Sequence, residues 1–308
     1  GWTEERGWQA VAKPHLTYLK KNYQGYLLML PFLLVFFTFT VWPVVMSMGL
    51  SFTTYNVFEA PRFLGFENYV KLFFNDSVFL TAMQNTFLLS IIVGPLSYLL
   101  SLFLAWMVNE FRNPWRTILT VVFYAPTLSN AVFTIWLIVF DGDIYGYLNS
   151  ILLKMGLISD PIQWTRDPKY MMMVVIIVQL WVSLGTSFLT LRAGFNTVDR
   201  QYYEAGSLDG IKNRWQELWY ITLPMIKPQM MFSAVMSITS AFNVGTLITA
   251  LCGYPTVDYA AHTIMNHLTD YGTIRFEMGY ASAIATLLFL MMVGANLLAQ
   301  RLIAKVGE

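Results

Sequence analysis

The stretch from Glu204 to Pro228, EAGSLDGIKNRWQELWYITLPMIKP, is the only long polar, helix-capable interruption in an apolar chain. Four long apolar runs precede it and two follow it. Asp209 and Gly210 near its start are a strong signal for a turn or a helix end, because glycine adopts a positive φ without steric cost. The stretch therefore predicts two helical pieces joined by a sharp turn, next to a fold that is otherwise built from apolar segments.

The composition around this stretch is typical of a membrane protein. Of the 308 residues, 56% are hydrophobic and 12% are charged, and the mean hydropathy is +0.52. A soluble domain carries about 25% charged residues. Uncharged runs of about 20 residues recur, and each is long enough to cross a hydrocarbon layer of about 30 Å. We therefore expect a polytopic, all-α membrane protein.

Six transmembrane helices can be drawn along the sequence. They are expected at about Tyr26–Leu50, Leu80–Val108, Ile118–Phe140, Tyr170–Leu191, Pro228–Leu251 and Met278–Leu302. Prolines inside these helices are tolerated where neighbouring helices satisfy the freed carbonyl groups. The expected organisation is an amino-terminal segment over residues 1–25 and one membrane domain over 26–308, with the polar connection at 195–227.

The distribution of Lys and Arg orients the six helices, because cytoplasmic loops carry an excess of these residues. With the amino terminus inside, thirteen of the 19 lie in cytoplasmic segments. The other six fall in three outer loops, at about 51–79, 141–169 and 252–277. These six are Arg62, Lys71, Lys154, Arg166, Lys169 and Arg275. We therefore expect both termini and the polar connection to be cytoplasmic.

Local signals give the polar connection a helical shape. Thr197 can cap a first helix with Asp199 in its first turn, where the positive end of the helix dipole favours an acid. Asn213 followed by Gln216 is typical of a pair that caps a second helix, and Pro224 suits the first turn of the next helix. A stiff element that transmits force and an ordinary interfacial linker both fit these residues.

Glu204 to Gly210 read E-A-x-x-x-D-G and are followed by I-x-L-P. This pattern resembles the EAA signature of permease subunits in binding-protein-dependent ABC importers. The residues at the signature positions are Glu204, Ala205, Asp209, Gly210, Ile221, Leu223 and Pro224. The third position, commonly alanine, is Gly206 here. We expect the packing to survive with a slightly looser helix, because glycine has more conformational freedom than alanine.

The resemblance extends along the chain to the carbohydrate-uptake branch of these permeases. FLGFENY at 63–69, Asn85-Thr86 and Gly279 match the pattern of that branch. After the fifth helix the branch often has T-x-G-G-P, whereas residues 249–255 here read TALCGYP. The layout is most similar to the first of the two permease subunits for maltose or glycerol phosphate.

This resemblance implies a type I ABC importer permease fold. In that family the motif forms a coupling helix in a groove of a cytoplasmic ATPase, so Glu204 to Gly210 would contact the ATPase, and Leu223 and Pro224 would hinge the helix to the fifth span. It also implies a second homologous permease, two ATPase subunits, an extracellular or periplasmic solute-binding protein, a carbohydrate substrate, and the plasma membrane of a bacterium or archaeon.

On this resemblance the chain itself is a non-catalytic transport subunit. The sequence has no G-x-x-x-x-G-K-[ST] loop for nucleotide phosphates. ATP and Mg would be bound by the ATPase partners, and the chain would carry no cofactor of its own. The net charge of +1 gives no reason to expect nucleic acid.

Neutral polar residues in the spans are candidates for a substrate path, because the central portions of the spans hold no Asp, Glu, Lys or Arg. The candidates are Tyr124 and Asn130 in span three, Gln179 and Ser183 in span four, and Ser237, Ser240 and Asn243 in span five. Small polar residues also pack membrane helices together, and we favour that role for the serines. For the amides Asn130, Gln179 and Asn243 we favour a place on the substrate path, because a buried amide needs several partners.

Two other classes of protein are less well supported. An ion-coupled secondary carrier of small polar solutes would be expected to bury a charged residue in a span, and an intramembrane enzyme would need a nucleophile paired with a base. His262 and His267 are five residues apart, off a common helix face, so we expect no metal site. The single cysteine, Cys252, excludes an internal disulfide.

Overall fold

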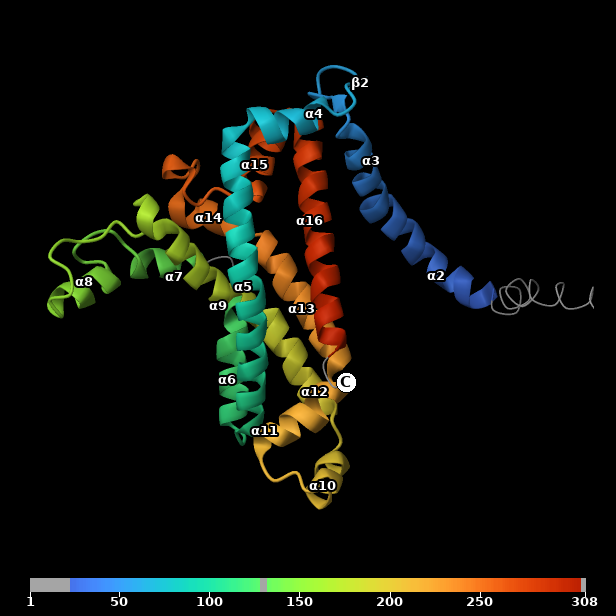
Figure 1. Cartoon of the computed structure of the whole chain (residues 1–308), viewed down its shortest axis with the longest axis vertical. Helices are drawn as coiled ribbons and strands as arrows, with labels where there is room; N and C mark the ends of the chain where they lie inside the picture. Colours follow the sequence, from blue (N-terminus) through green and yellow to red (C-terminus); the bar gives the residue numbers. More distant parts are fainter. Residues whose placement is uncertain (1–22, 128–131, 306–308) are drawn as a thin grey trace, which may run out of the picture.

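The computed structural model describes residues 23–127 and 132–305. The chain is a bundle of long helices with a small two-stranded hairpin at one end (Figure 1), so the all-α expectation is confirmed. In chain order the elements, with η for 3-10 and π-helical turns, are α2 (Tyr23–Phe36), η1 (Phe37–Val41), α3 (Trp42–Leu50), β1 (Thr53–Thr54), β2 (Arg62–Phe63), α4 (Glu67–Val70), η2 (Lys71–Asn75), α5 (Ser77–Glu110), α6 (Trp115–Tyr124), η3 (Ala125–Thr127), α7 (Val132–Val139), α8 (Tyr147–Lys154), α9 (Pro168–Thr197), α10 (Arg200–Leu208), α11 (Arg214–Glu217), η4 (Leu218–Thr222), α12 (Leu223–Met225), α13 (Lys227–Phe242), α14 (Gly245–Cys252), η5 (Val257–Tyr259), α15 (Ile264–Thr269), η6 (Asp270–Ile274) and α16 (Met278–Ala304).

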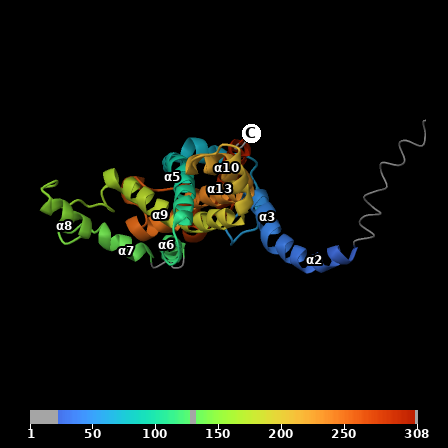
Figure 2. The same cartoon turned by 90° about the horizontal axis from the view of Figure 1, so that it is seen from below.

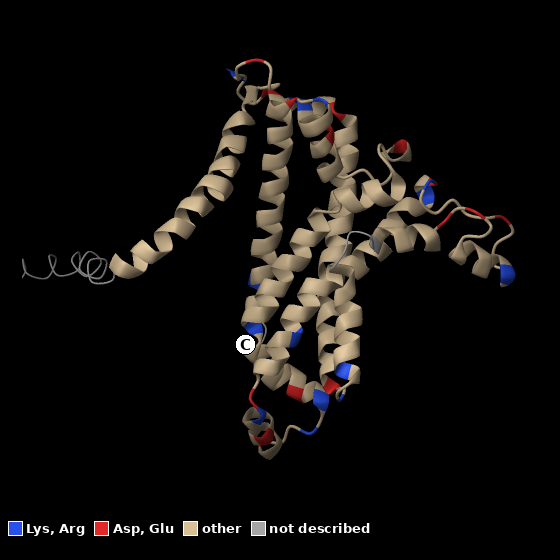
Figure 3. Cartoon of the chain, turned by 180° about the vertical axis from the view of Figure 1, so that it is seen from behind, with Lys and Arg blue, Asp and Glu red and all other residues tan. Residues whose placement is uncertain are grey.

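Five of the six expected spans correspond to long helices or a bent helix pair. Four segments are long and apolar enough to cross a membrane: Tyr23–Leu50, α5, α9 and α16. A fifth span is the pair α13 and α14, which is bent by 44° at a short break. Charged residues gather toward the two ends of the bundle and in the loops (Figure 3). This distribution is what a hydrocarbon layer around the middle of the bundle requires.

The third expected span, Ile118–Phe140, is not one continuous helix. The structure has α6, the 3-10 turn η3 and α7 in its place, and residues 128–131 lie outside the description. Pro126 lies in η3, and a proline lacks the N–H that an α-helix would use. Gly185 of α9 lets η3 approach, because a Cβ there would clash with the Thr127 side chain. The third expected span is therefore interrupted at η3.

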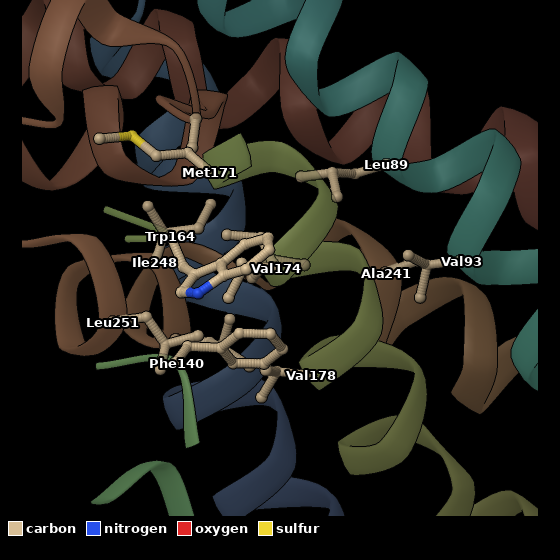
Figure 4. Close-up of a cluster of buried hydrophobic side chains, with 14 residues drawn as sticks. Leu89, Val93, Phe140, Trp164, Met171, Val174, Val178, Ala241, Ile248 and Leu251 are labelled. Carbon is tan, nitrogen blue, oxygen red and sulfur yellow. The ribbon is translucent and has the colours of Figure 1, made fainter. Parts of the chain in front are cut away.

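The centre of the bundle is formed by α5, α9, α13 and α16 (Figure 1). Figure 4 shows one of its clusters, in which Val93 of α5 lies near Ala241 of α13 and Val178 of α9 packs among the inner side chains. Phe140 and Trp164, from the connection between α7 and α9, join the same cluster. The arm that contains α7 and α8 is thereby fixed to the bundle.

Small residues allow α5 to approach α9 closely. Ser97, Ser101 and Ala105 recur every four residues on one face of α5, and all three are fully buried. Ser101 Oγ donates to the Leu184 carbonyl of α9 at 3.5 Å. Lipid tails are as apolar as leucine, so membrane helices are held by such close van der Waals contact rather than by a hydrophobic difference.

The first helix stands away from the bundle. None of the residues of α2, η1 and α3 is buried within the described chain, and Figures 1 and 2 show this helix extending to one side. It is attached at its far end, where the Gly279 N–H of α16 donates to the Tyr55 carbonyl at 2.9 Å. A Cβ on Gly279 would clash with the Thr53 carbonyl, so this joint requires glycine.

The connection around α8 is organised by one buried amide. Asn149 is fully buried, and its Nδ2 donates to the carbonyl groups of Asp141, Asp143 and Ile162 at 3.0–3.1 Å. Its Oδ1 accepts from the Ile162 N–H and from Trp164 Nε1. The Asn149 side chain thus satisfies backbone groups on both sides of the loop, which no helix or strand pairs there.

Candidate functional site

Residues singled out from the sequence fall in two regions of the structure. The first is the connection at residues 195–227, called the polar segment below, which includes α10, α11, η4 and α12. It lies at the end of the bundle where α16 also ends (Figure 1). The second is a cavity between η3, α7, α9 and α13. The hairpin and α15 lie at the opposite end, called the outer end below.

The cap of α10 differs from the expectation. Asp199 is the capping residue, and its Oδ1 accepts from the Gln201 N–H at 3.1 Å. Thr197 is still the last residue of α9, and its hydroxyl donates back to the Gly194 carbonyl at 2.7 Å. Thr197 cannot cap α10 because Val198, in an extended conformation, separates the two helices.

The turn in the polar segment is confirmed. α10 ends at Leu208, and Gly210 has a φ of 95°, a conformation that glycine adopts without cost. Asn213 caps α11 by accepting from the Gln216 N–H at 2.8 Å. The Gln216 side chain accepts in turn from the Lys212 N–H rather than from Asn213. The segment is therefore a helix, a sharp turn and a second helical run, as predicted.

Two contacts fix α10 onto the second helical run. Gly206 is buried, and a Cβ built on it would stand 2.6 Å from Ile221 Cδ1. Tyr203 and Thr222 share a hydrogen bond of 2.9 Å between their hydroxyl groups. We expected Gly206 to loosen the helix. The structure shows instead that the missing side chain permits a close approach, so α10 and η4 form one packed unit.

The break before α13 lies later than expected. Leu223 is buried and Pro224 is in α12, so both belong to a helical run rather than to a hinge. The backbone leaves the helical conformation at Ile226, with φ −93° and ψ 14°. Pro228 then occupies the first turn of α13, where its missing N–H costs nothing.

Much of the surface of α10 is open. Glu204, Ala205 and Asp209 are exposed. Leu208 is 89% exposed, an unusual state for a leucine at a helix end. Glu204 makes only a surface ion pair with Arg200, at 3.6 Å, and such pairs contribute little to stability. The signature residues therefore lie on a surface that a partner can reach.

The cavity lies where α13 faces α9. It has a volume of about 330 Å³. Its described lining residues are all uncharged, and they are Pro126, Thr127, Phe133, Val182, Ser183, Thr186, Ser187, Met236, Thr239, Ser240 and Asn243. Three of the predicted path residues, Ser183, Ser240 and Asn243, are in this set. Met236 and Thr239 also line the cavity but were not predicted. They lie on the same face of α13 as Ser240 and Asn243, and this helical spacing could have identified them.

Gln179 lies beside the cavity and links the two helices. It is 3% exposed, and its Nε2 lies 3.0 Å from both the carbonyl and the hydroxyl of Ser240 and 3.2 Å from Ser183 Oγ. Ser183 and Ser240 also bond to each other at 3.1 Å. The Gln179 amide nitrogen is thus occupied within the protein, so the structure gives this residue a packing role rather than a place on the lining.

The remaining candidates are placed differently. Ser237 is buried and bonds to Ser187 at 2.9 Å between α13 and α9. Tyr124, at the end of α6, is half-buried and does not line the cavity. Asn130 lies outside the described residues. Asn243 is exposed at the break between α13 and α14, where the backbone leaves the helix at φ −99° and ψ 47°.

A buried polar chain holds the outer end together. Asp76 caps α5, and its other oxygen accepts from the Tyr280 hydroxyl at 2.8 Å and from His267 at 3.0 Å. Burial alone would raise the pKa of Asp76. The hydrogen bonds from His267, the Phe79 N–H and Tyr280 nevertheless hold this pKa well below its usual value.

His262 continues this chain. Its ring lies 3.4 Å from that of His267, nitrogen to nitrogen. Burial and the neighbouring His267 lower the pKa of His262 to about 4, so the ring is neutral at ordinary pH. In the described part of the chain, no three His, Cys, Asp or Glu side chains come together as metal ligands.

The model of the family described as "Binding-protein-dependent transport system inner membrane component" matches residues 97–308. The chain belongs to this family. The matched residues include both candidate regions of this inner membrane component, the polar segment and the helices that line the cavity.

Relatives of this inner membrane component span nearly its whole length. It is 33% identical over 279 residues to the probable ABC transporter permease protein YesP of Bacillus subtilis, covering 89% of this chain and 88% of YesP. It is 30% identical over 231 residues to the lactose transport system permease protein LacF of Rhizobium radiobacter, covering 74% and 75%.

Solved structures share the fold. A chain of a bacterial ABC transporter involved in the import of the acidic polysaccharide alginate superimposes with a TM-score of 0.75 at 23% identity, covering 96% of this chain and all of that one. A second structure of the alginate transporter, in complex with an alginate pentasaccharide-bound periplasmic protein, gives the same TM-score. The fold is therefore that of an ABC importer permease.

Proposed function

We propose that this inner membrane component is the transmembrane subunit of an ATP-driven sugar importer. Together with a second permease it encloses the path for a sugar or oligosaccharide, and two ATPase subunits drive it through α10. The observation that carries the proposal is a continuous series of packed elements from α10 to the cavity. α10 packs on η4 through Gly206 and Ile221, η4 runs through α12 into α13, and α13 forms one wall of the cavity.

This connection explains how a movement outside the membrane reaches the path. An ATPase that pushes on the exposed face of α10 would displace η4 as well, because the two are packed and hydrogen-bonded together. The displacement tilts α13 at Ile226 and moves Ser240 and Asn243 on the cavity wall. Hydrolysis of ATP, with its Mg, belongs to the ATPase, and this chain converts the motion.

A second permease would cover apolar surface that this chain leaves open. α2, η1 and α3 bury nothing within the described chain. α3 packs against α16, but α2 and η1 extend away from the bundle and leave room for another subunit. Several relatives are named as permease proteins of transport systems, LacF among them.

The cavity supports an uncharged sugar as the substrate. Hydroxyl groups of Ser183, Thr239 and Ser240 and the amide of Asn243 offer neutral donors and acceptors, which suit the hydroxyl groups of a sugar. Relatives are named for lactose and for arabinooligosaccharides. The alginate relative takes an acidic polysaccharide, and the described cavity lacks a basic side chain for such a ligand.

A solute-binding protein would deliver the sugar at the outer end. The hairpin, α8 and α15 provide its docking surface, with both termini and the polar segment in the cytoplasm of a bacterium or archaeon. The experiment is to purify the complex from its natural membrane and weigh its subunits. Recovery of a second permease and an ATPase supports the proposal, and a chain that is isolated and functional alone contradicts it.

A further inference from the structure

The seam between α6 and α9 ends in two arginines. Phe123 of α6 packs on Phe188 of α9 with ring centroids 5.5 Å apart, and Leu119 continues the same cluster. Arg116 lies seven residues before Phe123, and Arg192 lies four residues after Phe188. Both spacings return to the same helix face. The apolar seam therefore leads, at the end of the bundle that carries the polar segment, to a pair of guanidinium groups.

These guanidinium groups have no acidic partner among the described residues. Arg116 donates from Nε to the Phe111 carbonyl at 2.9 Å and from Nη2 to the Asn109 carbonyl at 2.6 Å, which satisfies the end of α5. Arg192 Nε is buried and finds no partner in the described part of the chain.

Two other arginines near this end of the bundle have acidic partners. Arg200 pairs with Glu204, and Arg214 pairs with Glu110 and Glu217. A buried guanidinium N–H without an acceptor is costly, and two like charges at one seam add to that cost. Arg116 and Arg192 would therefore be stabilised by an anion that lies between them.

We propose that Arg116 and Arg192 bind the phosphate of an anionic phospholipid at the end of the α6–α9 seam. Guanidinium groups bind phosphate through paired, charge-assisted hydrogen bonds. The terminal N–H groups of Arg192 and the Nη1 of Arg116, which makes no hydrogen bond among the described residues, supply the donors. No bond is made or broken, so the lipid acts as a bound structural ligand.

The surroundings favour a lipid over an anion from solution. Trp115, 63% exposed, adjoins Arg116 at the start of α6, and tryptophan is enriched where membrane helices meet the headgroup layer. Ile118 and Val122 of α6 are about half exposed and offer an apolar surface to acyl chains. Basic pockets between membrane helices on the cytoplasmic side are a recurring form of headgroup site.

The site adjoins the polar segment. Arg112 and Arg116 line a cleft of about 770 Å³, and its other lining residues include Tyr203, Arg214 and the carboxylates of Glu110, Glu204 and Glu217. A lipid held at Arg116 and Arg192 would brace α6 against α9 beside the base of α10. The binding itself does not depend on the proposed function, because it needs only the chain in a bilayer.

The test measures retained lipid. The full chain, with any subunits that co-purify, is placed in nanodiscs of phosphatidylcholine with or without phosphatidylglycerol, and bound lipid is counted by native mass spectrometry after transfer to detergent. We expect Arg192→Gln and Arg116→Gln to lower phosphatidylglycerol retention about tenfold, since each removes a charge-assisted contact to phosphate. Arg192→Lys should keep part of it.

A matched control and three results decide the proposal. Arg301 is an exposed arginine toward the same end, on α16, so Arg301→Gln should retain lipid as the wild type does. Equal retention by the wild type and Arg192→Gln would overturn the proposal. So would binding of inorganic phosphate by a wild type that retains no phosphatidylglycerol, which would indicate an anion from solution. Restoration of an Arg192→Glu complex by a basic residue placed in a partner subunit would assign the pair to a protein contact instead.

Discussion

Gly206 of α10 faces Ile221 of η4 so closely that a Cβ on Gly206 would stand 2.6 Å from the Ile221 Cδ1 atom. This contact joins the segment that carries the EAA-like signature to the run of helix that enters the membrane. Because the close atom is the end of a flexible side chain, a methyl group can be accommodated there, whereas a larger side chain cannot.

The first prediction concerns this contact. Gly206→Leu should separate α10 from η4, cost about 1–3 kcal/mol through overpacking, and reduce sugar uptake to background. Gly206→Ala combined with Ile221→Val should keep uptake near the wild-type value, because the shorter side chain makes room for the added methyl group. Uptake assays in whole cells, with membrane levels of each variant measured by immunoblot, check both. Full activity of Gly206→Leu would show that the contact does not transmit motion.

A second prediction concerns the exposed face of α10. Glu204→Lys replaces one half of a surface pair, so it should change the free energy of unfolding by less than about 1 kcal/mol, yet abolish uptake because the ATPase no longer docks. Gly210→Pro should have the same result, since a proline cannot adopt the φ of 95° found at that position. Both variants should still insert in the membrane. Normal coupling of ATP hydrolysis to uptake in either one would refute the role of α10.

A third prediction separates packing from path. Gln179→Leu removes the donor to Ser240 and Ser183, so it should lower the stability of the detergent-solubilised chain by about 1 kcal/mol, the scale of a hydrogen bond between membrane helices. Asn243→Ala changes an exposed cavity residue outside that network, so it should alter uptake and leave the melting temperature unchanged. If Asn243→Ala lowers stability as much as Gln179→Leu does, the assignment of the two roles is wrong.

A fourth prediction concerns pH at the outer end. The pKa of His262 is about 4 in the folded chain, below the value of about 6.5 for an unfolded histidine. The folded state therefore binds fewer protons, so this stabilisation is fully present above pH 6.5 and is lost as the pH falls toward 4. The pKa of Asp76 is also lowered in the folded chain. Its contribution to stability is therefore lost at a lower pH, starting near the pKa of an unfolded aspartate.

Thermal unfolding at pH 7.5, 6, 5 and 4.5 tests this account. Between pH 6.5 and 4.5 the wild type should lose on the order of 2 kcal/mol more than His262→Gln does, because the variant has no group that must stay neutral. Asp76 is common to both proteins and cancels in the comparison. Parallel pH profiles for the two proteins would contradict the buried, neutral state of His262.

A fifth prediction tests the orientation. The chain has one cysteine, Cys252, so a Cys252→Ser background allows single labels. Leu208→Cys, on the most exposed part of α10, should react with an impermeant maleimide only after the membrane is opened. Tyr145→Cys, 84% exposed in the arm before α8, should react in intact cells after the outer barrier is made permeable. The reverse pattern would place the polar segment outside.

The sequence predicted what depends on local pattern. Charge-free runs identify α5, α9 and α16 because hydrocarbon excludes charge, and Asp209-Gly210 identifies the turn because few residues tolerate that φ. The break in the third span was harder to predict. Pro126 is tolerated inside membrane helices in general, and what decides the local shape is the approach of Gly185 to Thr127, a contact between residues far apart in the chain.

The candidate site was predicted only in part for the same reason. The polar stripes of α9 and α13 were visible as spacings, but nothing in one helix shows that Gln179 and Ser240 satisfy each other across the interface. Asn243 was found because it extends a stripe, whereas the helix break at this residue and the close approach of Gly245 to Met265 beside it are visible only in the structure.

ATP hydrolysis in partner subunits should drive import through this chain. The most direct measurement is uptake of radiolabelled sugar into proteoliposomes that hold the purified complex, with ATP and Mg on the ATPase side and the binding protein on the other. The account predicts uptake that requires ATP, the binding protein and an intact Glu204. Uptake by this chain alone, driven by a proton or sodium gradient without ATP, would contradict it and identify an ion-coupled carrier.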